Sequence, residues 1–546
     1  MNMKKRFIAM MAIAAMTTAS FTGCSKMKEV SEKTQSSSLL QTVQASTKSE
    51  TATTKKTKTP KYIFLFIGDG MSYPQVQLTN YYISAVNQDT TDTITVGDTQ
   101  KDILRSENQL TMMDFDIAGS AQTYDSTSFA PDSASTATSI ATGKKTWSGS
   151  INVSEDFSQD YETITEKLKD QKNYKIGIIS SVNLNHATPA AFYAHQVSRN
   201  SYYEIGLELI DSGFDYFAGG GLKKTTGSDG TKTDLYTLAE EAGYKVVKTQ
   251  AEAEKLTAAD GKVIVIDEHL ADSDAMSYDI DRADDEWALA DYVEKGIEVL
   301  DNDNGFFMMV EGGKIDWACH ANDAGSTIAD TLALDHAVQE AVDFYNEHPD
   351  ETLIIVTGDH ETGGLTIGYA GTDYDTFLTN LENQKISYAK YDSEYVSSYK
   401  ENKTKFKTVL KDIEELFGLK APTDTTDSTT GLDSADVHKS SSEDGSLVMT
   451  NYEYEKLKMA YKETMLRSGS EVEFSQADYI AYGSYEPLTV TITHILNNKS
   501  GINFASYAHT GLPVEVLVEG VGAETFDGYY DNTDIYNKLA ALTGVK

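Results

Sequence analysis

The sequence Tyr62-Ile63-Phe64-Leu65-Phe66-Ile67 decides the fold, and Gly68-Asp69-Gly70 follows it directly. Six consecutive apolar or aromatic residues are typical of a strand that is buried on both faces, as the strands of parallel sheets are. Glycine and aspartate favour turns, so the strand should end there. We therefore predict a buried parallel strand with Asp69 just beyond its carboxyl end.

Similar apolar runs recur along the chain, at Lys175–Ile179, Val263–Ile266, Phe306–Val310 and Leu353–Val356. Helical patterns lie between them, for example at Tyr161–Gln171 and Trp287–Leu300. An alternation of strands and helices is typical of βαβ units. The sequence thus predicts an α/β fold in which helices sandwich a central, mostly parallel sheet.

The alternation breaks between about Gly371 and Gly501, a stretch that is rich in Tyr, Lys and Asp. Within it, Pro422–Gly445 has almost no residue suited to a core. Long segments of this kind are typical of functional or mobile loops. We expect a large insertion, about 371–501, which carries a mobile loop and precedes the C-terminal segment of the fold.

The beginning of the chain has the pattern of a targeting segment. Basic residues 4–6 precede the apolar run Phe7–Ala19, which is too short to cross a membrane as a helix. Ser20-Phe21-Thr22-Gly23-Cys24 resembles a bacterial lipobox, although Leu is commoner than Phe at its second position. In that interpretation 1–23 is a lipoprotein signal peptide and a lipid on Cys24 anchors the protein to the bacterial membrane. The alternative is an ordinary secretory signal, and both predict an exported, extracytoplasmic protein.

Residues 24–59 are dominated by Ser, Thr and Lys. Such a composition cannot bury enough apolar surface to offset the entropy lost on ordering. We predict a flexible tether, followed by one folded domain, 60–546.

Composition excludes several functional classes. Among 546 residues, 46 are basic and 84 acidic, which gives a formal net charge of −38 at pH 7. Nucleic-acid polymers require a concentrated basic surface, so they are not expected partners. Two cysteines can form neither a disulfide framework nor a four-cysteine metal site. The surplus carboxylates either solvate the surface or partly bind metal ions.

Acidic residues stand where the predicted strands end. Asp69 follows the first strand, Glu311 ends the strand at Phe306–Val310, and Asp359-His360 come two residues after Leu353–Val356. Sites in open α/β sheets lie beyond the carboxyl ends of the strands. Bare carboxylates at one sheet edge would repel one another, and cations would remove that repulsion. The pattern favours a metal site, although Asp69 alone is typical of a turn.

Other candidate residues are ambiguous when each is taken alone. Asp316 and His320 share one face of a helix and can chelate one ion, yet most such pairs are surface pairs. Ser133 follows Asp132 at an expected helix start. The two residues are either an ordinary helix cap, or they place the Ser133 hydroxyl at a helix N-terminus, where an alkoxide or phosphate is favoured. No Gly-x-Ser-x-Gly elbow is present, so metal coordination would have to activate the serine. Arg199 has the planar fork that grips a phosphoryl group, or it is a surface charge.

Taken in order, the motifs resemble those of alkaline phosphatase. They are Phe66-Ile67-Gly68-Asp69-Gly70-Met71, Asp132-Ser133-Ala134, His186-Ala187-Thr188-Pro189-Ala190, Glu311-Gly312-Gly313-Lys314-Ile315-Asp316 with His320, Thr357-Gly358-Asp359-His360-Glu361-Thr362-Gly363-Gly364, and His509-Thr510-Gly511. The segment Asp531-Asn532-Thr533-Asp534-Ile535 is similar to the family's C-terminal segment. The resemblance spans about Pro60 to Ala370 and Ser506 to the end.

The resemblance implies two zinc ions, one magnesium ion and a set of ligands. One zinc would be held by Asp316, His320 and His509, the other by Asp69, Asp359 and His360, and the magnesium by Asp69, Thr188 and Glu311. It further implies that Ser133 attacks the phosphorus of a small phosphate monoester and forms a phosphoserine, while Arg199 holds two phosphoryl oxygens. Hydrolysis then releases inorganic phosphate. Family resemblance also suggests a homodimer.

Two alternatives stay open at the level of the sequence. One is a phosphodiesterase or phosphonate-ester hydrolase on the same metal scaffold, although such relatives often carry Thr where this chain has Ser133. The other is a non-catalytic lipoprotein that binds phosphate or metal.

The chain departs from the enterobacterial members of the family at two positions near the expected magnesium site. His186 stands where they have Asp, and Trp317 stands where they have Lys. A neutral imidazole attracts magnesium less than a carboxylate does. We therefore expect a looser magnesium site. Cys319, between two expected ligands, is predicted to be an inert, packed thiol.

Overall fold

A computed structural model describes residues 58–88, 93–96, 99–102, 104–107, 109–372, 374–422, 447–467 and 475–546. The predicted signal segment 1–23 lies outside the described residues, as do the predicted tether up to residue 57 and the predicted mobile loop from residue 423 onward. Within the described ranges, no helix is both long enough and apolar enough to span a bilayer.

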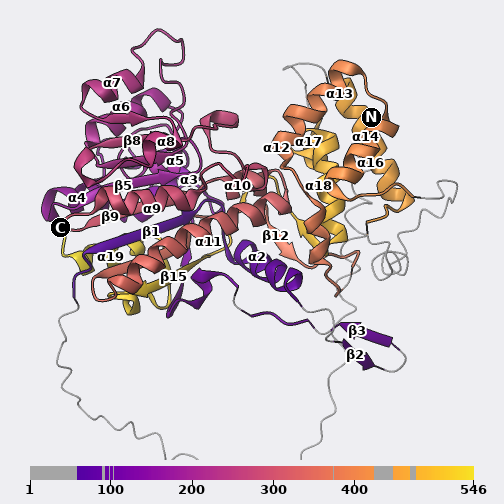
Figure 1. Cartoon of the computed structure of the whole chain (residues 1–546), viewed down its shortest axis with the longest axis horizontal. Coiled ribbons are helices and arrows are strands. Elements are labelled where there is room, and N and C mark those ends of the chain that lie inside the picture. Colours follow the sequence, from indigo (N-terminus) through magenta and orange to yellow (C-terminus); the bar gives the residue numbers. More distant parts are fainter. Residues whose placement is uncertain are drawn as a thin grey trace, which may run out of the picture. The chain divides into compact units, whose positions relative to one another are not determined.

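A ten-stranded sheet forms the centre of the fold (Figure 1). Within the described part of the chain, β15 runs antiparallel to both of its neighbours, and the other pairings in this sheet are parallel. In spatial order the strands are β16 (Tyr529–Asp531), β4 (Ile117–Gln122), β15 (Val514–Gly520), β10 (Thr352–Gly358), β1 (Tyr62–Gly68), β9 (Phe306–Gly312), β5 (Lys175–Ser180), β6 (Tyr216–Gly219), β8 (Val263–Ile266) and β7 (Lys245–Val247). The predicted mostly parallel sheet is confirmed.

The five apolar runs of the sequence became the inner strands β1, β5, β8, β9 and β10. All residues of β1 are buried, because β9 and β10 flank it and helices cover both of its faces. Some of the strands that the sequence did not reveal have weaker patterns. In β4, for example, Ile-Ala-Gly-Ser-Ala-Gln has one large apolar residue.

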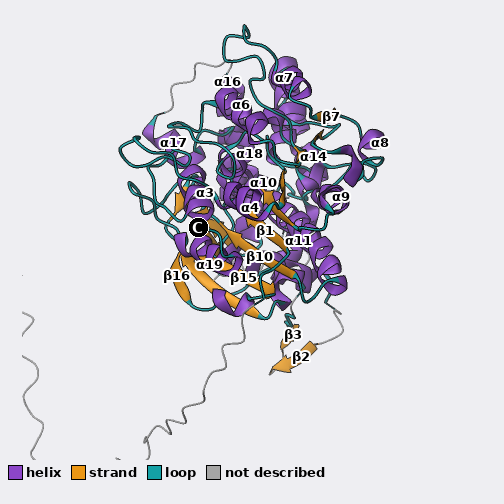
Figure 2. Ribbon diagram, turned by 90° about the vertical axis from the view of Figure 1, so that its left-hand side faces the viewer, coloured by secondary structure: helices purple, strands orange, loops and turns teal. Residues whose placement is uncertain are grey.

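Successive side chains of β1 enter two different cores, as the pleat of a strand requires. Phe64 and Phe66 belong to one core, and Ile63 and Leu65 belong to the other. The first core is covered by α2 (Tyr73–Val86), α9 (Leu289–Leu300), α10 (Lys314–His320) and α11 (Ala324–Glu347). The second is covered by α3 (Ser133–Thr142), α4 (Ile164–Lys172), α6 (Tyr202–Ser212), α7 (Leu235–Glu241) and α19 (Thr533–Thr543). Figure 2 shows helices on both sides of the sheet.

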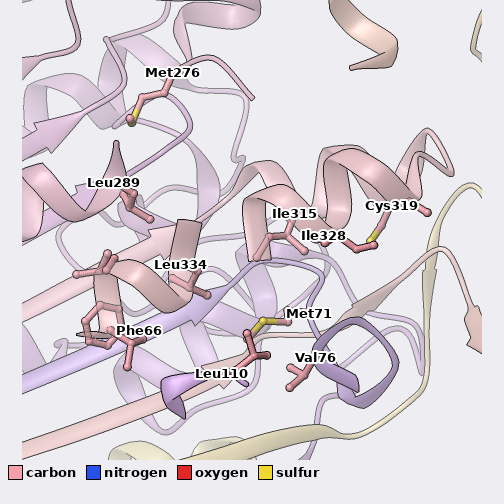
Figure 3. Packing of buried hydrophobic residues seen from close by; sticks show 14 of the residues in the cluster. Phe66, Met71, Val76, Leu110, Met276, Leu289, Ile315, Cys319, Ile328 and Leu334 are labelled. Atoms are coloured by element: carbon pink, nitrogen blue, oxygen red, sulfur yellow. The ribbon is translucent and has the colours of Figure 1, made fainter. Parts of the chain in front are cut away.

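The first core reaches the helix that carries two expected metal ligands. Ile315 and Cys319 of α10 lie with Ile328 of α11 in this core (Figure 3). Because residues three or four apart share a helix face, Asp316 and His320 share a face of α10 that differs from the one of Ile315 and Cys319. Packing of the apolar face therefore fixes the direction of the polar one.

Two helices begin later than the sequence suggested. The prediction of a helix from Tyr161 was wrong about its start, since α4 begins at Ile164. Thr163 caps this helix: its side chain accepts from the Glu166 amide at 3.2 Å, and the Glu166 carboxylate accepts from the Thr163 amide at 2.7 Å. This reciprocal capping stops the helix from extending backwards. Similarly, α9 begins at Leu289 rather than at Trp287.

The described part of 371–501 is helical, and none of its described residues joins the ten-stranded sheet. Its helices gather on the right of Figure 1: α12 (Tyr388–Lys390), α13 (Ser397–Asn402), α14 (Phe406–Phe417), α16 (Asn451–Leu466), α17 (Gln476–Tyr482) and α18 (Pro487–Lys499). We call these helices the insertion helices, and the insertion itself stays a prediction. The described residues also form three two-stranded sheets: β2 (Thr93–Val96) with β3 (Thr99–Asp102), β11 (Glu361–Thr362) with β14 (His509–Thr510), and β12 (Leu365–Ile367) with β13 (Ile502–Phe504).

The contact between α9 and the sheet yields a test of core stability. Leu300 is fully buried, and its Cδ1 lies so close to β5 that a Cβ on Gly177 would approach it to 2.7 Å. Leu300→Ala should therefore lower the free energy of unfolding by about 2–5 kcal/mol, because it leaves a cavity. Denaturant unfolding of the metal-saturated protein measures the change.

The matched control is Leu466→Ala, since Leu466 is 77% exposed. Surface substitutions usually change stability by about 0.5 kcal/mol or less. Equal effects of the two substitutions would contradict this description of the α9 contact.

Candidate active site

Strand register brings the acidic residues to one edge of the sheet. Gly68 at the end of β1 pairs with Gly312 of β9 and with Gly358 of β10. Asp69 and Asp359 each follow one of these registered glycines. Glu311 is one residue before the end of β9. The three carboxylates therefore converge because three parallel strands end at the same level.

Two glycines make this convergence possible. A Cβ on Gly358 would lie 1.7 Å from the carbonyl oxygen of Met71, a distance that no side chain can occupy. Gly70 has φ +73°, and its amide donates to Asp359 Oδ1 at 3.1 Å. Glycine adopts this left-handed conformation without steric cost. The turn after β1 thereby binds the aspartate that follows β10.

Ser133 lies against the first group of candidate ligands. Its Oγ is 3.3 Å from Asp69 Oδ1 and 3.2 Å from His360 Nε2. His360 Nε2 is in turn 3.3 Å from Asp69 Oδ1 and 3.4 Å from Asp359 Oδ2. All four side chains are buried. The hydroxyl of Ser133 and the three expected ligands of one zinc thus form a single cluster.

Ser133 is the first residue of α3, and Asp132 caps that helix. The Asp132 carboxylate accepts from the Ser135 amide at 3.2 Å. A helix N-terminus carries partial positive charge, which favours an anion at that end. The position therefore suits a serine oxygen that becomes negative or bears a phosphoryl group.

Arg199 is held beside Ser133 by the same aspartate. Its Nη1 donates to Asp132 Oδ2 at 2.9 Å, and its Nη2 donates to His186 Nε2 at 3.2 Å. Burial and the Arg199 charge lower the pKa of His186 to about 3, so the imidazole is neutral. Asp132 therefore links the helix of Ser133 to the candidate phosphoryl-binding cation Arg199. The motif Asp132-Ser133-Ala134 contained this residue, but nothing in its pattern showed that it would pair with Arg199.

Asp316, His320 and His509 form a second group. His320 Nε2 and His509 Nε2 lie 3.3 and 3.6 Å from Asp316 Oδ1, and 3.1 Å from each other. His320 Nδ1 donates to the carbonyl of Tyr507 at 2.7 Å, and His509 Nδ1 donates to the carbonyl of Pro131 at 2.5 Å. A carbonyl can only accept, so both Nδ1 atoms carry the proton.

This tautomer turns the Nε2 lone pairs of His320 and His509 toward the Asp316 carboxylate. Three electron-rich atoms so arranged require a positive charge between them. Burial lowers the pKa of His320, but the Asp316 charge outweighs it and raises the pKa to about 9. The group therefore attracts either a proton or a metal cation.

A third group surrounds Glu311. Thr188 Oγ1 donates to Asp69 Oδ2 at 3.4 Å, and Ser180 Oγ donates to Glu311 Oε2. Glu311 Oε1 is buried without a hydrogen-bond partner among the described residues. One potential ligand atom from each of Asp69, His186 and Glu311 lies within 4.8 Å of the others. A buried acceptor without a donor in this position fits a bound cation.

The pKa values of the buried acidic side chains also favour a bound cation. Burial, with the charge of Asp359, raises the pKa of Asp69 well above its usual range. Burial also raises the pKa of Glu311 to about 8 and that of Asp359 to about 7. Carboxylates and imidazoles are ligands for zinc, and carboxylates with hydroxyls suit magnesium. The donor set thus fits divalent cations, and every predicted ligand lies in one of the three groups.

Neither Trp317 nor Cys319 adds a ligand. The Trp317 ring lies edge-on to the His186 ring, with centroids 5.9 Å apart, and the Lys314 ammonium lies over the Trp317 ring, 4.8 Å from its centroid. Cys319 is fully buried, and burial raises the pKa of its thiol. A thiol of this kind is unreactive. Thr362 was not singled out from the sequence, yet its hydroxyl donates to Asp316 Oδ1 at 2.5 Å.

Comparison with known proteins settles the family. A family model described as alkaline phosphatase matches residues 60–545. The chain belongs to the alkaline phosphatase family. The resemblance seen in the motifs is thereby confirmed, and the chain is a phosphatase. Membership supports the hydrolysis of phosphate monoesters, and the family is metal-dependent.

Relatives match over nearly the whole chain. Alkaline phosphatase 4 of Bacillus subtilis (strain 168) is 27% identical over 546 residues, which cover 98% of this chain and 96% of the relative. The cold-active alkaline phosphatase of Shewanella sp. superposes with a TM-score of 0.66 at 24% identity, covering 88% of this chain and 99% of that one. A histidine-to-aspartate variant of the alkaline phosphatase from the Antarctic bacterium TAB5, with magnesium bound in its M3 site, has a TM-score of 0.56 at 23% identity and covers 90% of this chain and 100% of its own. These structures share the fold.

The buried carboxylates predict how stability of the metal-free phosphatase depends on pH. Glu311 and Asp359 bind protons more tightly in the folded state than in the unfolded state, since burial raises their pKa values to about 8 and about 7. Their contribution to stability is complete below their unfolded pKa values and is lost as pH rises through the folded ones. Because the unfolded pKa values are about 4, the thermal midpoint of EDTA-treated protein should fall as pH rises from about 5 to about 8 and level off above that.

Metal-saturated protein is the control, because bound cations replace the protons and remove this dependence. Differential scanning calorimetry of both forms at several pH values measures it. A midpoint that rises with pH over this range in the metal-free form would contradict the electrostatic description of the cluster.

Proposed function

We propose that this chain hydrolyses phosphate monoesters through a phosphoserine intermediate on Ser133, at a site completed by two zinc ions and one magnesium ion. The observation that carries the proposal is the place of Ser133 Oγ, 3.3 Å from Asp69 and 3.2 Å from His360, at the N-terminus of α3 and beside the anchored Arg199. Family membership supports the reaction class.

The metal ligands are proposed from the three groups of side chains. Asp316, His320 and His509 would hold one zinc, Asp69, Asp359 and His360 the other, and Asp69, Thr188 and Glu311 the magnesium, with His186 nearby. When bound, such cations lower the pKa of a coordinated hydroxyl and neutralise charge on the leaving oxygen. Cobalt or manganese also bind ligands of these types.

The chain's own residues supply position and charge for two displacements. Ser133 Oγ forms a bond to phosphorus while the bond between phosphorus and the ester oxygen breaks, and the alcohol leaves after taking a proton. Water oxygen then bonds to phosphorus, the bond to Oγ breaks, and inorganic phosphate leaves while Ser133 regains its proton. Arg199, oriented by Asp132 at 2.9 Å, binds phosphoryl oxygens in both steps. Catalysis of this kind rests on positioning and electrostatics.

Small phosphate esters are the proposed substrates, in spite of the formal net charge of −38. Three dications would bring six positive charges to a site in which Asp69, Glu311, Asp316 and Asp359 supply four negative ones. The charge of Arg199 is offset by that of Asp132, so the net positive charge of the site comes from the cations. A pocket that is positive locally can receive a phosphate dianion, whereas a nucleic-acid polymer would meet the acidic surface.

Export and membrane attachment are proposals from the sequence of the first 24 residues. We infer that the protein is extracytoplasmic and held on the bacterial membrane by a lipid on Cys24. The lipobox-like pattern that ends at Cys24 supports the anchor. Assembly as a homodimer is inferred from the family resemblance alone.

Substitution of the nucleophile tests the reaction. Ser133→Ala should reduce kcat for an aryl phosphate monoester by roughly a thousandfold or more, because it removes the hydroxyl that would form the covalent intermediate. In the unsubstituted protein, rapid acid quenching followed by peptide mass spectrometry should find phosphate on Ser133. Ser139→Ala is the matched control, since Ser139 lies on the same helix and its hydroxyl bonds only the Ser135 carbonyl, at 3.0 Å.

The same assay with an aryl phosphate diester and with EDTA separates the alternatives. Metal-dependent hydrolysis of the monoester in preference to the diester is expected. A preference for the diester would favour a phosphodiesterase or phosphonate-ester hydrolase instead. Binding of phosphate without turnover would favour a non-catalytic lipoprotein.

His186 should weaken the magnesium site. Its imidazole is neutral, with a pKa of about 3, and therefore attracts the cation less than a carboxylate would. His186→Asp should lower the magnesium concentration that half-restores activity after mild magnesium depletion. For comparison, the histidine-to-aspartate variant of the TAB5 enzyme holds magnesium in its M3 site.

His186→Asn is the control for that substitution, because Asn has the size of Asp but no charge. It should leave the half-restoring concentration unchanged or higher. An identical magnesium dependence and rate in His186→Asp and the unsubstituted enzyme would refute the prediction.

A further inference from the structure

The turn after α10 is held by one buried side chain, that of Asn322. Its backbone has φ +54°, a left-handed conformation that Asn tolerates better than most residues. Its Nδ2 donates to the carbonyl of Cys319 at 2.9 Å and to the carbonyl of Ser506 at 2.8 Å. Both Nδ2 protons are thereby used. Asn322 thus closes the C-terminus of α10 and binds it to the segment before His509.

That segment, Ser506–His509, carries the contact that orients His320. The carbonyl of Tyr507 accepts from His320 Nδ1 at 2.7 Å. The other side of the segment is fixed to the loop after Asp359, since the Gly363 amide donates to the Ala508 carbonyl at 3.0 Å. A displacement of Ser506 would therefore move the carbonyl that sets the tautomer and direction of His320.

Helix α18, one of the insertion helices, makes two further contacts with Asn322. His494 Nε2 lies 3.0 Å from Asn322 Oδ1, and Asn497 Nδ2 donates to the Asn322 carbonyl at 2.8 Å. Because Asn322 Nδ2 is fully used, Oδ1 must accept, and His494 carries its proton on Nε2. Burial lowers the pKa of His494 to about 3, which keeps the ring neutral. The ring also stacks on Tyr507, with centroids 6.0 Å apart and an angle of 26°.

We propose that His494 is a positioning residue for the zinc that Asp316, His320 and His509 would hold. It acts through the hydrogen bond to Asn322 and through the backbone of Ser506 and Tyr507, which together fix His320. This inference rests on the proposed function, because it concerns one of the proposed zinc sites. The insertion helices would thereby affect the proposed zinc site, although none of the proposed ligands lies in 371–501.

The effect should be confined to one of the two zinc ions. Asp69 and Asp359 follow strands whose ends are fixed by the register of the sheet, and Gly70 holds Asp359. His494 makes no contact with that group. By contrast, His320 lies only two residues before Asn322, at the end of α10. Loss of the His494 donor should therefore loosen one zinc equivalent and spare the other.

The test compares zinc retention in purified full-length variants by titration with a chromophoric chelator. His494→Phe keeps an aromatic ring against Tyr507 but removes the donor to Asn322. One zinc equivalent should bind about tenfold more weakly, the lower end of the usual effect of removing a partner that orients a ligand. His494→Gln retains an N–H donor near the Nε2 position and should restore most of the affinity.

Two further variants guard against a general loss of structure. Tyr461→Phe removes a donor elsewhere in the insertion helices, the Tyr461 hydroxyl that donates to the Thr404 carbonyl at 2.5 Å, and should leave both zinc equivalents unchanged. If His494→Phe does not fold, Asn322→Asp replaces the donor to Ser506 with an acceptor of equal size. It should produce the same selective loss.

The outcomes separate the two levels of inference. Two zinc equivalents of unchanged affinity in His494→Phe, or equal weakening of both, would overturn the role of His494 while leaving the proposed function intact. Absence of bound zinc in the unsubstituted protein would instead refute the proposed metal site, and the role of His494 with it. Selective loss, with rescue by His494→Gln, supports the proposal.

Discussion

Repulsion among buried carboxylates is the constraint on which the rest of the structure depends. The register of β1, β9 and β10 brings Asp69, Glu311 and Asp359 to one edge, where burial, together with neighbouring negative charges, raises their pKa values. Such an arrangement is stable only with protons or cations between the oxygens. The same buried carboxylates therefore destabilise the sheet edge when they are charged and offer ligand atoms to a cation.

The polar groups around this edge are arranged so that each is oriented by a neighbour. Asp132 caps the helix of Ser133 and holds Arg199, and backbone carbonyls fix the tautomers of His320 and His509. Such support determines the direction in which a ligand or cation points, which residue identity alone does not. It also explains how a strongly acidic chain can present a local site for a phosphate dianion.

Sequence predicted the parts of the fold that have local patterns. The apolar runs identified β1 and β9 because both faces of an inner strand are buried. The start of α4 was predicted too early because Thr163 caps the helix. Spacing and order of motifs named the candidate ligands, and the structure brings them together. The link from His494 to Asn322 escaped prediction because it joins residues far apart in the chain, and neither lies in a recognisable pattern.

Strand β15 differs from its neighbours in direction, and this difference determines where the segment that carries His509 enters the sheet edge. Because β15 is antiparallel to β10, it begins at the sheet edge where β10 ends. His509, five residues before β15, therefore lies near the residues that follow the parallel strands. It also joins β4 to the rest of the sheet, although Ser120 of β4 precedes Val514 of β15 by 394 residues. Contacts of such long range form late in folding. Ser133 and most of the proposed ligands are thus synthesised long before β15, the strand that completes the sheet edge at which they meet.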